Sequence, residues 1–70
     1  MDRPYTTRAQ RALTLAEGTA AARGDEFVGT EHLLLGLLAE RTGPAAQILG
    51  HLGVTADRVE QLLADARPRP

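Results

Sequence analysis

The polar residues best placed to do chemistry stand in one short run, Gly29-Thr30-Glu31-His32, which leads into a leucine-rich segment. Glu31 and His32 are adjacent, so on a helix their side chains point in different directions and cannot act as one acid–base pair. A histidine near a helix start is more often structural than catalytic. A helix start explains the run by itself, because Thr30 is a good N-cap and Glu31 places negative charge at the positive end of the helix dipole.

Motifs of the common catalytic and cofactor sites are missing from the sequence. It contains no lysine and no cysteine, so it has no Gly-x-x-x-x-Gly-Lys phosphate loop, no thiol nucleophile and no Cys-based metal site. The two histidines, His32 and His51, are far apart along the chain. His51 is expected in the last turn of a helix, where a cation is favourable. We therefore expect no enzyme, no metal and no cofactor.

Length and composition indicate one small helical domain. The chain has 70 residues, and alanine and leucine dominate its 43% hydrophobic content, which favours helices over strands. The only aromatic residues are Tyr5 and Phe27. The net charge of −1 carries no signal for nucleic acid, and the apolar runs are too short to span a membrane. With no signal peptide visible, the expected location is cytoplasmic.

Glycines and capping residues divide the chain into elements that must position the polar run. Gly24 suits the left-handed residue after a helix, and Pro44 suits the first position of another. Because the gaps are short, neighbours in sequence should pack together, with the leucine-rich helix at the centre. The predicted fold is all-α, a compact bundle of four to five short helices. Helices are expected over about residues 6–23, 30–40, 44–52 and 55–66.

Helical spacing assigns most apolar side chains to one buried face of each helix. In the central helix that face is predicted to hold Leu33, Leu34, Leu37 and Leu38. In the third and fourth helices it is predicted to include Ile48, Leu49, Leu52, Val59, Leu62 and Leu63. Leu15 and Leu35 fall off these faces, so each belongs either to the core of a surrounded helix or to an interface with another chain.

Three segments of the sequence carry a resemblance to a known family. They are Tyr5 to Leu13, Phe27 to Leu38 and Gly43 to Val54. The second segment contains the most specific motif, the run Gly-Thr-Glu-His-Leu-Leu-Leu-Gly-Leu. In order and spacing they resemble a single N-terminal repeat of the Clp-type AAA+ unfoldases, half of their double N-terminal domain. We expect residues 5–66 to form the repeat, residues 1–4 an N-terminal extension, and residues 67–70 a flexible Arg-Pro tail.

The resemblance implies a binding role. In that family two repeats pack with pseudo-two-fold symmetry, and the domain receives adaptors and substrate proteins. In the ClpC branch it also binds phosphorylated arginine, a degradation mark. Glu31 matches the glutamate that pairs with the guanidinium group, Thr30 matches the threonine of the same motif, and Thr6 matches a threonine that helps to hold the phosphate. Pro4 stands where ClpC-type repeats often carry arginine.

Two functional hypotheses follow, and both concern proteins or peptides as partners. In the first, the chain is a non-catalytic module that binds substrate peptides, degradation marks or adaptors in Clp-dependent proteolysis. In the alternative, it is a structural or regulatory subunit that docks onto an unfoldase or another such domain without a ligand site. We also expect a homodimer, with Tyr5, Leu15 and Leu35 as interface candidates. Whether the chain is a stand-alone protein or a fragment stays open.

Overall fold

The computed structural model describes residues 4–66, and this part of the chain folds into four helices without a strand. The predicted all-α fold is confirmed. The prediction of a flexible tail concerns residues 67–70, which lie outside the described residues, as do residues 1–3 of the predicted extension. The helices are α1 (Thr7–Arg23), α2 (Thr30–Ala39), α3 (Pro44–His51) and α4 (Ala56–Ala66).

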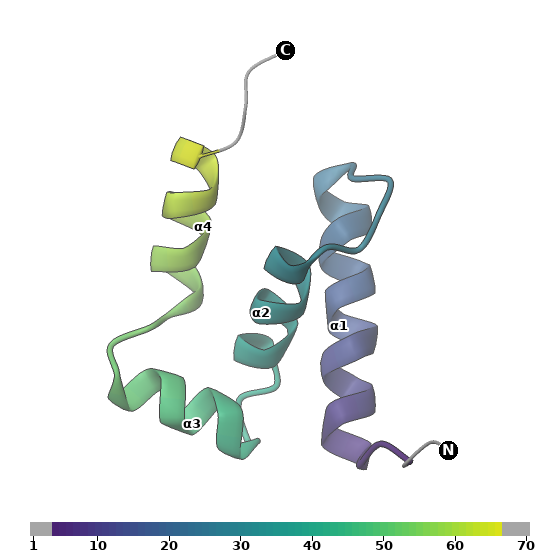
Figure 1. Ribbon diagram of the computed structural model, residues 1–70, viewed down its shortest axis with the longest axis vertical. Helices are drawn as coiled ribbons and strands as arrows, with labels where there is room; N and C mark the ends of the chain where they lie inside the picture. Colours follow the sequence, from purple (N-terminus) through teal and green to yellow (C-terminus); the bar gives the residue numbers. More distant parts are fainter. Residues whose placement is uncertain (1–3, 67–70) are drawn as a thin grey trace.

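Helix α2 is the centre of the fold, as its leucine content predicted. It lies between α1 and α4, while α3 crosses near its C-terminal end (Figure 1). Within the described residues α2 contacts all three other helices, most extensively α1. The expectation that every pair of sequence neighbours packs together is wrong for α3 and α4, because α4 folds back onto α2 instead.

Local capping explains where the outer helices begin and end. The hydroxyl of Thr6 accepts a hydrogen bond from the backbone N–H of Ala9 at 3.1 Å and so caps α1. Gly24 ends α1 with a φ of 75°, a left-handed conformation that glycine adopts without steric cost. Thr55 caps α4 in the same way as Thr6 caps α1, with the N–H of Arg58 at 3.3 Å.

The seam between α1 and α2 is built from small residues. Ala12, Ala16 and Ala20 are the buried residues of α1, and Gly36 of α2 is packed against them. A Cβ atom on Gly36 would overlap the carbonyl oxygen of Ala12 and lie only 3.0 Å from the backbone N of Ala16. The two helices therefore approach as closely as their backbones allow, and position 36 has room only for glycine.

The remaining core is small and lies on another face of α2. Leu35, Leu38 and Val59 are its buried members, and partly buried neighbours from α2, α3, α4 and the loop before α4 surround them. Leu35 is only 4% exposed, so it belongs to the core and offers no surface to a second chain. Because Gly36 faces α1, the helix is turned so that Leu35 rather than Leu37 points into this core.

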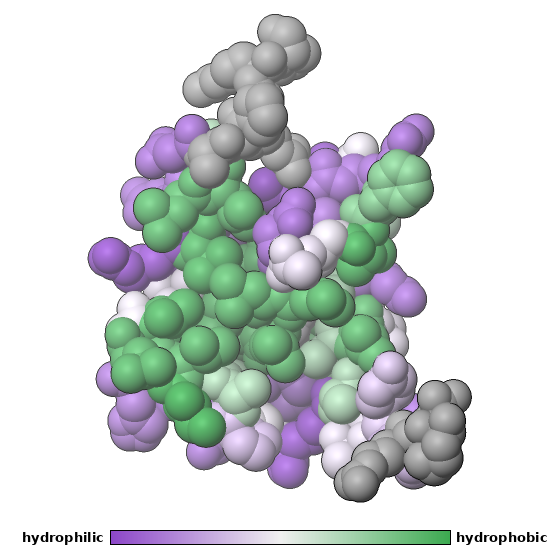
Figure 2. All heavy atoms as spheres, in the orientation of Figure 1, coloured by the Kyte–Doolittle hydropathy of each residue, from purple (hydrophilic) through white to green (hydrophobic). Residues whose placement is uncertain are grey.

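Several leucines predicted to be buried are exposed. Leu33 and Leu37 are each 37% exposed, and Ile48, Leu52 and Leu62 are more exposed still. The reason is that the single repeat has no helix to cover these faces: α3 and α4 each contact α2 along one narrow strip. Figure 2 shows the resulting hydrophobic surface as a broad patch over α2, α3 and α4.

Candidate protein-interaction site

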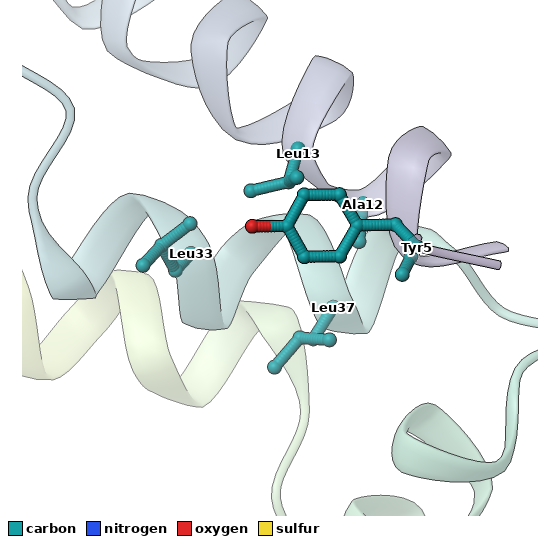
Figure 3. Close-up of a pocket in the computed structure, with 6 residues that line it drawn as sticks. Tyr5, Ala12, Leu13, Leu33 and Leu37 are labelled. Carbon is teal, nitrogen blue, oxygen red and sulfur yellow. The ribbon is translucent and has the colours of Figure 1, made fainter. Parts of the chain in front are cut away.

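One hollow in the surface is an apolar groove on the seam between α1 and α2. Its volume is about 260 Å³, and no charged side chain lines it. Figure 3 shows that the ring of Tyr5 lies over the groove between Leu13 and Leu37, with its hydroxyl directed toward Leu33. We call this surface the α1–α2 groove; it is lined by Tyr5, Ala9, Ala12, Leu13, Leu33 and Leu37.

The shape of the α1–α2 groove follows from the small residues beneath it. Ala9 and Ala12 are the small lining residues on α1, and Figure 3 shows Ala12 behind the Tyr5 ring with leucines from both helices around it. Tyr5 is 66% exposed, so its ring covers the groove without being packed into the fold. A groove of this kind suits an apolar side chain or a short apolar segment of another protein, because burial of nonpolar surface drives such binding.

The polar turn before α2 differs from the prediction in its capping. Thr30 is the first residue of α2 and is exposed, while Gly29 occupies the N-cap position, so Thr30 is not the N-cap. The cap is completed by His32, whose Nδ1 accepts a hydrogen bond from the backbone N–H of Gly29 at 2.7 Å. His32 Nε2 lies 2.7 Å from Oδ2 of Asp25. The structural interpretation of His32 therefore holds, through a contact that the sequence did not indicate.

Glu31 is half-buried, and its side chain folds back over the N-cap glycine. A Cβ atom at Gly29 would stand 2.5 Å from Oε1 of Glu31. The absence of a side chain at position 29 thus leaves room for the Glu31 carboxylate at the positive end of the α2 dipole. In this position the carboxylate stays accessible to a ligand, and a guanidinium group is a suitable partner for it.

The three predicted binding residues do not converge in one copy of the chain. Thr6 caps the start of α1, whereas Thr30 and Glu31 begin α2 beside the far half of α1, since the two helices run in opposite directions. Gly36 packs between Ala12 and Ala16, so a rise of about 1.5 Å per residue places Thr6 and Glu31 roughly 20 Å apart along the seam. One phosphoarginine side chain cannot touch both.

A basic cluster near Thr6 was missed, because the arginines looked scattered in the sequence. Thr6, Thr7, Arg8, Arg11 and Pro44 line one shallow pocket at the start of α1. The sequence feature that indicates this basic cluster is the spacing of Arg8 and Arg11, which are three residues apart at a helix N-terminus and so lie on the same face. Positive side chains beside the positive end of a helix dipole favour an anion there.

Glu40 balances part of this positive charge and closes the loop to α3. Its Oε1 accepts hydrogen bonds from the hydroxyl of Thr42 at 2.8 Å and from the Thr42 backbone N–H at 3.2 Å. Arg11 Nη1 lies 3.6 Å from Glu40 Oε2, and Arg8 Nε donates to the Thr42 hydroxyl at 3.4 Å. The Thr42 hydroxyl bond and the nearby Arg11 charge hold the pKa of Glu40 below its ordinary value of 4.5.

Leu15 lies apart from the α1–α2 groove. At 100° per residue, Leu13 and Leu15 are about 160° apart around α1 and flank the buried alanines on opposite sides. Leu15 is 39% exposed, so it remains available to a partner, but not through the same face as Tyr5. Tyr5 and Leu15 therefore define two different candidate interfaces.

Other kinds of site find no support in the part of the chain that the structure describes. Residues 4–66 hold no group of three His, Asp or Glu side chains arranged to bind a metal ion. None of their helices combines the length and the apolar content that a membrane crossing requires. The hydrogen-bonded polar side chains described above cap helices and close turns, and the prominent accessible feature is an apolar groove. The class defined by this fold and site is a small helical protein-interaction domain.

Comparison with known proteins identifies the family. The Clp repeat (R) N-terminal domain matches residues 4–69. Chaperone protein ClpB of Oceanobacillus iheyensis and the negative regulator of genetic competence ClpC/MecB of Bacillus subtilis are each 44% identical over 57 residues, 81% of this chain. Chaperone protein ClpC, chloroplastic, of Pisum sativum is 50% identical over 50 residues, 71% of the chain. The chain belongs to the Clp N-terminal repeat family.

The match concerns a small part of each relative. The chain spans 7% of the length of the ClpB and ClpC/MecB proteins and 5% of the chloroplast ClpC. It corresponds to one Clp repeat, which is a non-catalytic domain of these unfoldases. Within that repeat the exposed apolar groove and patch are the features available for contact with other proteins.

Proposed function

We propose that this chain is a capture module in Clp-dependent protein handling, acting in the cytoplasm on substrate proteins or adaptors. The observation that carries the proposal is the α1–α2 groove, an uncharged hollow of about 260 Å³ on a domain of the Clp repeat family. Exposed apolar patches rimmed by polar residues are typical of protein-binding surfaces. The groove holds apolar side chains of the bound protein, and the polar ends of the seam set its orientation.

The module acts as a homodimer. Among residues 4–66 the core cluster has three buried members, Leu35, Leu38 and Val59, and a chain this short buries too little surface to be more than marginally stable alone. A second copy packed against the Tyr5 edge of the groove would cover part of the apolar surface that the fold leaves exposed and leave the rest to the bound protein, in the manner of the paired repeats that the family resemblance implies. The residues covered would be drawn from Tyr5, Leu13, Leu33, Leu37, Ile48, Leu52 and Leu62.

A second copy would also bring Glu31 of one chain near Thr6 of the other. Glu31 provides a carboxylate for a guanidinium group, while Thr6 and the arginines beside it provide an environment for a phosphate group. Because Thr6 and Glu31 lie at opposite ends of the seam, a phosphoarginine that uses both kinds of group needs one from each copy. Arg8 and Arg11 supply positive charge at the end where this chain has Pro4 and ClpC-type repeats often carry arginine.

The test is binding of a peptide that carries one phosphoarginine, measured by fluorescence anisotropy. Glu31→Gln removes the carboxylate charge and should weaken binding at least about tenfold, because a charge-assisted pair is lost. Glu26→Gln, in the exposed turn before α2, makes the same change of charge away from the proposed contact and should leave binding unchanged. Equal binding by both variants would show that Glu31 does not contact the ligand and only stabilises the start of α2.

The alternative function is docking onto a Clp unfoldase or another Clp-N-like domain without a ligand site. The hydrophobic patch over α2, α3 and α4 favours it, because a patch that spans three helices suits a broad contact with another folded domain (Figure 2). Immobilised protein incubated with a bacterial lysate separates the two ideas. A capture module retains varied client proteins, whereas a docking subunit retains the unfoldase itself, as identified by mass spectrometry.

A further inference from the structure

His32 is the most deeply buried ionisable side chain of the described residues, and neither the groove nor the proposed contacts use it. It is 1% exposed. Its Nδ1 lies 2.7 Å from the backbone N of Gly29, and its Nε2 lies 2.7 Å from Oδ2 of Asp25. A backbone N–H is always a donor, so Nδ1 carries no proton, and the ring proton sits on Nε2 and is donated to Asp25.

This imidazole fixes the place where α2 begins. The carbonyl oxygen of Gly29 accepts hydrogen bonds from the backbone N–H groups of His32 and Leu33, both at 3.1 Å. Gly29 is thus held at its carbonyl by the helix and at its N–H by the His32 side chain. Since Thr30 and Glu31 follow directly, their positions depend on the same contact.

The charged groups around His32 are unevenly placed. On the Nε2 side stands the carboxylate of Asp25, and Arg23 Nε at the end of α1 lies 3.6 Å from the same oxygen. On the Nδ1 side the neighbour is the glycine N–H, with the Glu31 carboxylate folded over that glycine. The turn also carries Glu26, which is exposed, and α1 contributes only alanines to the buried seam.

We propose that His32 is a proton-sensitive latch on the turn between α1 and α2. With a neutral ring, Nδ1 accepts the Gly29 N–H and the turn is closed. When the ring takes a second proton, on Nδ1, two N–H donors face each other and that hydrogen bond is lost. Asp25 retains the imidazolium through Nε2, so the opening is confined to the turn. The opening needs no ligand; its effect on Glu31 as a binding residue rests on the proposed function.

The experiment is amide hydrogen exchange followed by NMR at about pH 7.5 and about pH 5.5, which bracket the range where histidines change charge. The protein carries His51→Gln, a change at an exposed position, so that every imidazole signal comes from His32. The protection factor of the Gly29 amide, corrected for intrinsic exchange, should fall at least about tenfold at the lower pH, since a partly buried donor loses its acceptor. The amide of Gly36 in the seam should keep its protection.

A matched variant distinguishes the latch from a general effect of acid. In His32→Asn the side-chain oxygen can accept the Gly29 N–H in place of Nδ1 but takes no proton. Protection of Gly29 in that variant should be the same at both pH values. The ring nitrogen chemical shifts of the parent protein provide a second measurement that does not depend on the variant folding: they should report a proton on Nε2 alone at the higher pH.

Three results would overturn the latch. They are a proton on Nδ1 at the higher pH, a ring that stays neutral while the chain remains folded at the lower pH, and an unchanged Gly29 amide after the ring has become charged. The proposed function fails separately. If the phosphoarginine peptide binds at neither pH while Gly29 responds as expected, the latch stands and the capture role does not.

Discussion

Replacing Gly36 with alanine tests the packing on which the fold depends. A Cβ atom at this position would overlap the carbonyl oxygen of Ala12 and stand 3.0 Å and 3.1 Å from the N and Cβ of Ala16. All three atoms belong to the α1 backbone or to a short rigid side chain, so none can move aside on its own. The methyl group can enter only if α1 shifts outward along the whole seam.

The expected magnitude follows from two opposing terms. Alanine gains about 1 kcal/mol over glycine inside a helix. Overpacking a tight contact typically costs about 1–3 kcal/mol, and here α1 would also lose contact at its buried alanines, so the cost lies at or above the upper end. We predict a net loss of about 2 kcal/mol for Gly36→Ala, a large share of the few kcal/mol that stabilise a chain this small.

Gly18→Ala is the matched control. Gly18 is also inside a helix, but apart from its two chain neighbours and the adjacent backbone of α1 no atom lies within 4 Å of the position that its Cβ would take, so alanine there should stabilise the fold by about 1 kcal/mol. Both variants are compared with the parent chain by urea denaturation followed by circular dichroism. Equal chain concentrations are needed, because self-association would change the apparent stability. A Gly36→Ala variant as stable as the Gly18→Ala variant would refute the close seam.

Four further predictions follow from particular contacts. Thr6→Ala should cost about 1 kcal/mol in urea denaturation, because α1 loses its N-cap. Leu38→Ala should cost about 2–5 kcal/mol by the same method, since Leu38 is a buried core residue. Phe27→Ser should change stability by less than about 0.5 kcal/mol, because Phe27 is largely exposed. Because the pKa of Glu40 is lowered in the folded state, its carboxylate stabilises the fold at pH values above the unfolded-state pKa. This contribution is lost as the pH falls through the folded-state pKa. The stability difference between the parent and Thr42→Val should therefore shrink on acidification.

The helix boundaries could be predicted because short-range chemistry determines them. Thr6, Gly24, Pro44 and Thr55 each act within one helical turn, and each does in the structure what its residue type indicates. The start of α2 was the exception. Its cap is a histidine side chain three residues into the helix, and neither Thr30 nor helix propensity signals that contact.

The buried faces could be predicted less well. In α2 leucines occupy nearly the whole circumference, so periodicity cannot choose between Leu35 and Leu37 for the core; Gly36 makes the choice by admitting α1. In α4 the periodicity was clear, but Leu62 was assigned to a core that the single repeat is too small to extend, and it is exposed. The distance between Thr6 and Glu31 could not be predicted from local sequence patterns, because it depends on the antiparallel packing of α1 and α2.

The measurement that tests the central claim most directly is sedimentation equilibrium at micromolar concentration. We predict twice the chain mass for the parent protein and a single chain mass for Tyr5→Asp, which puts a charge over the α1–α2 groove at an exposed position and should not disturb folding. Leu15→Asp, on the opposite flank of α1, should remain a dimer. A parent protein that sediments as a monomer throughout would contradict the dimer, and a dimer broken only by Leu15→Asp would place the interface on the other face.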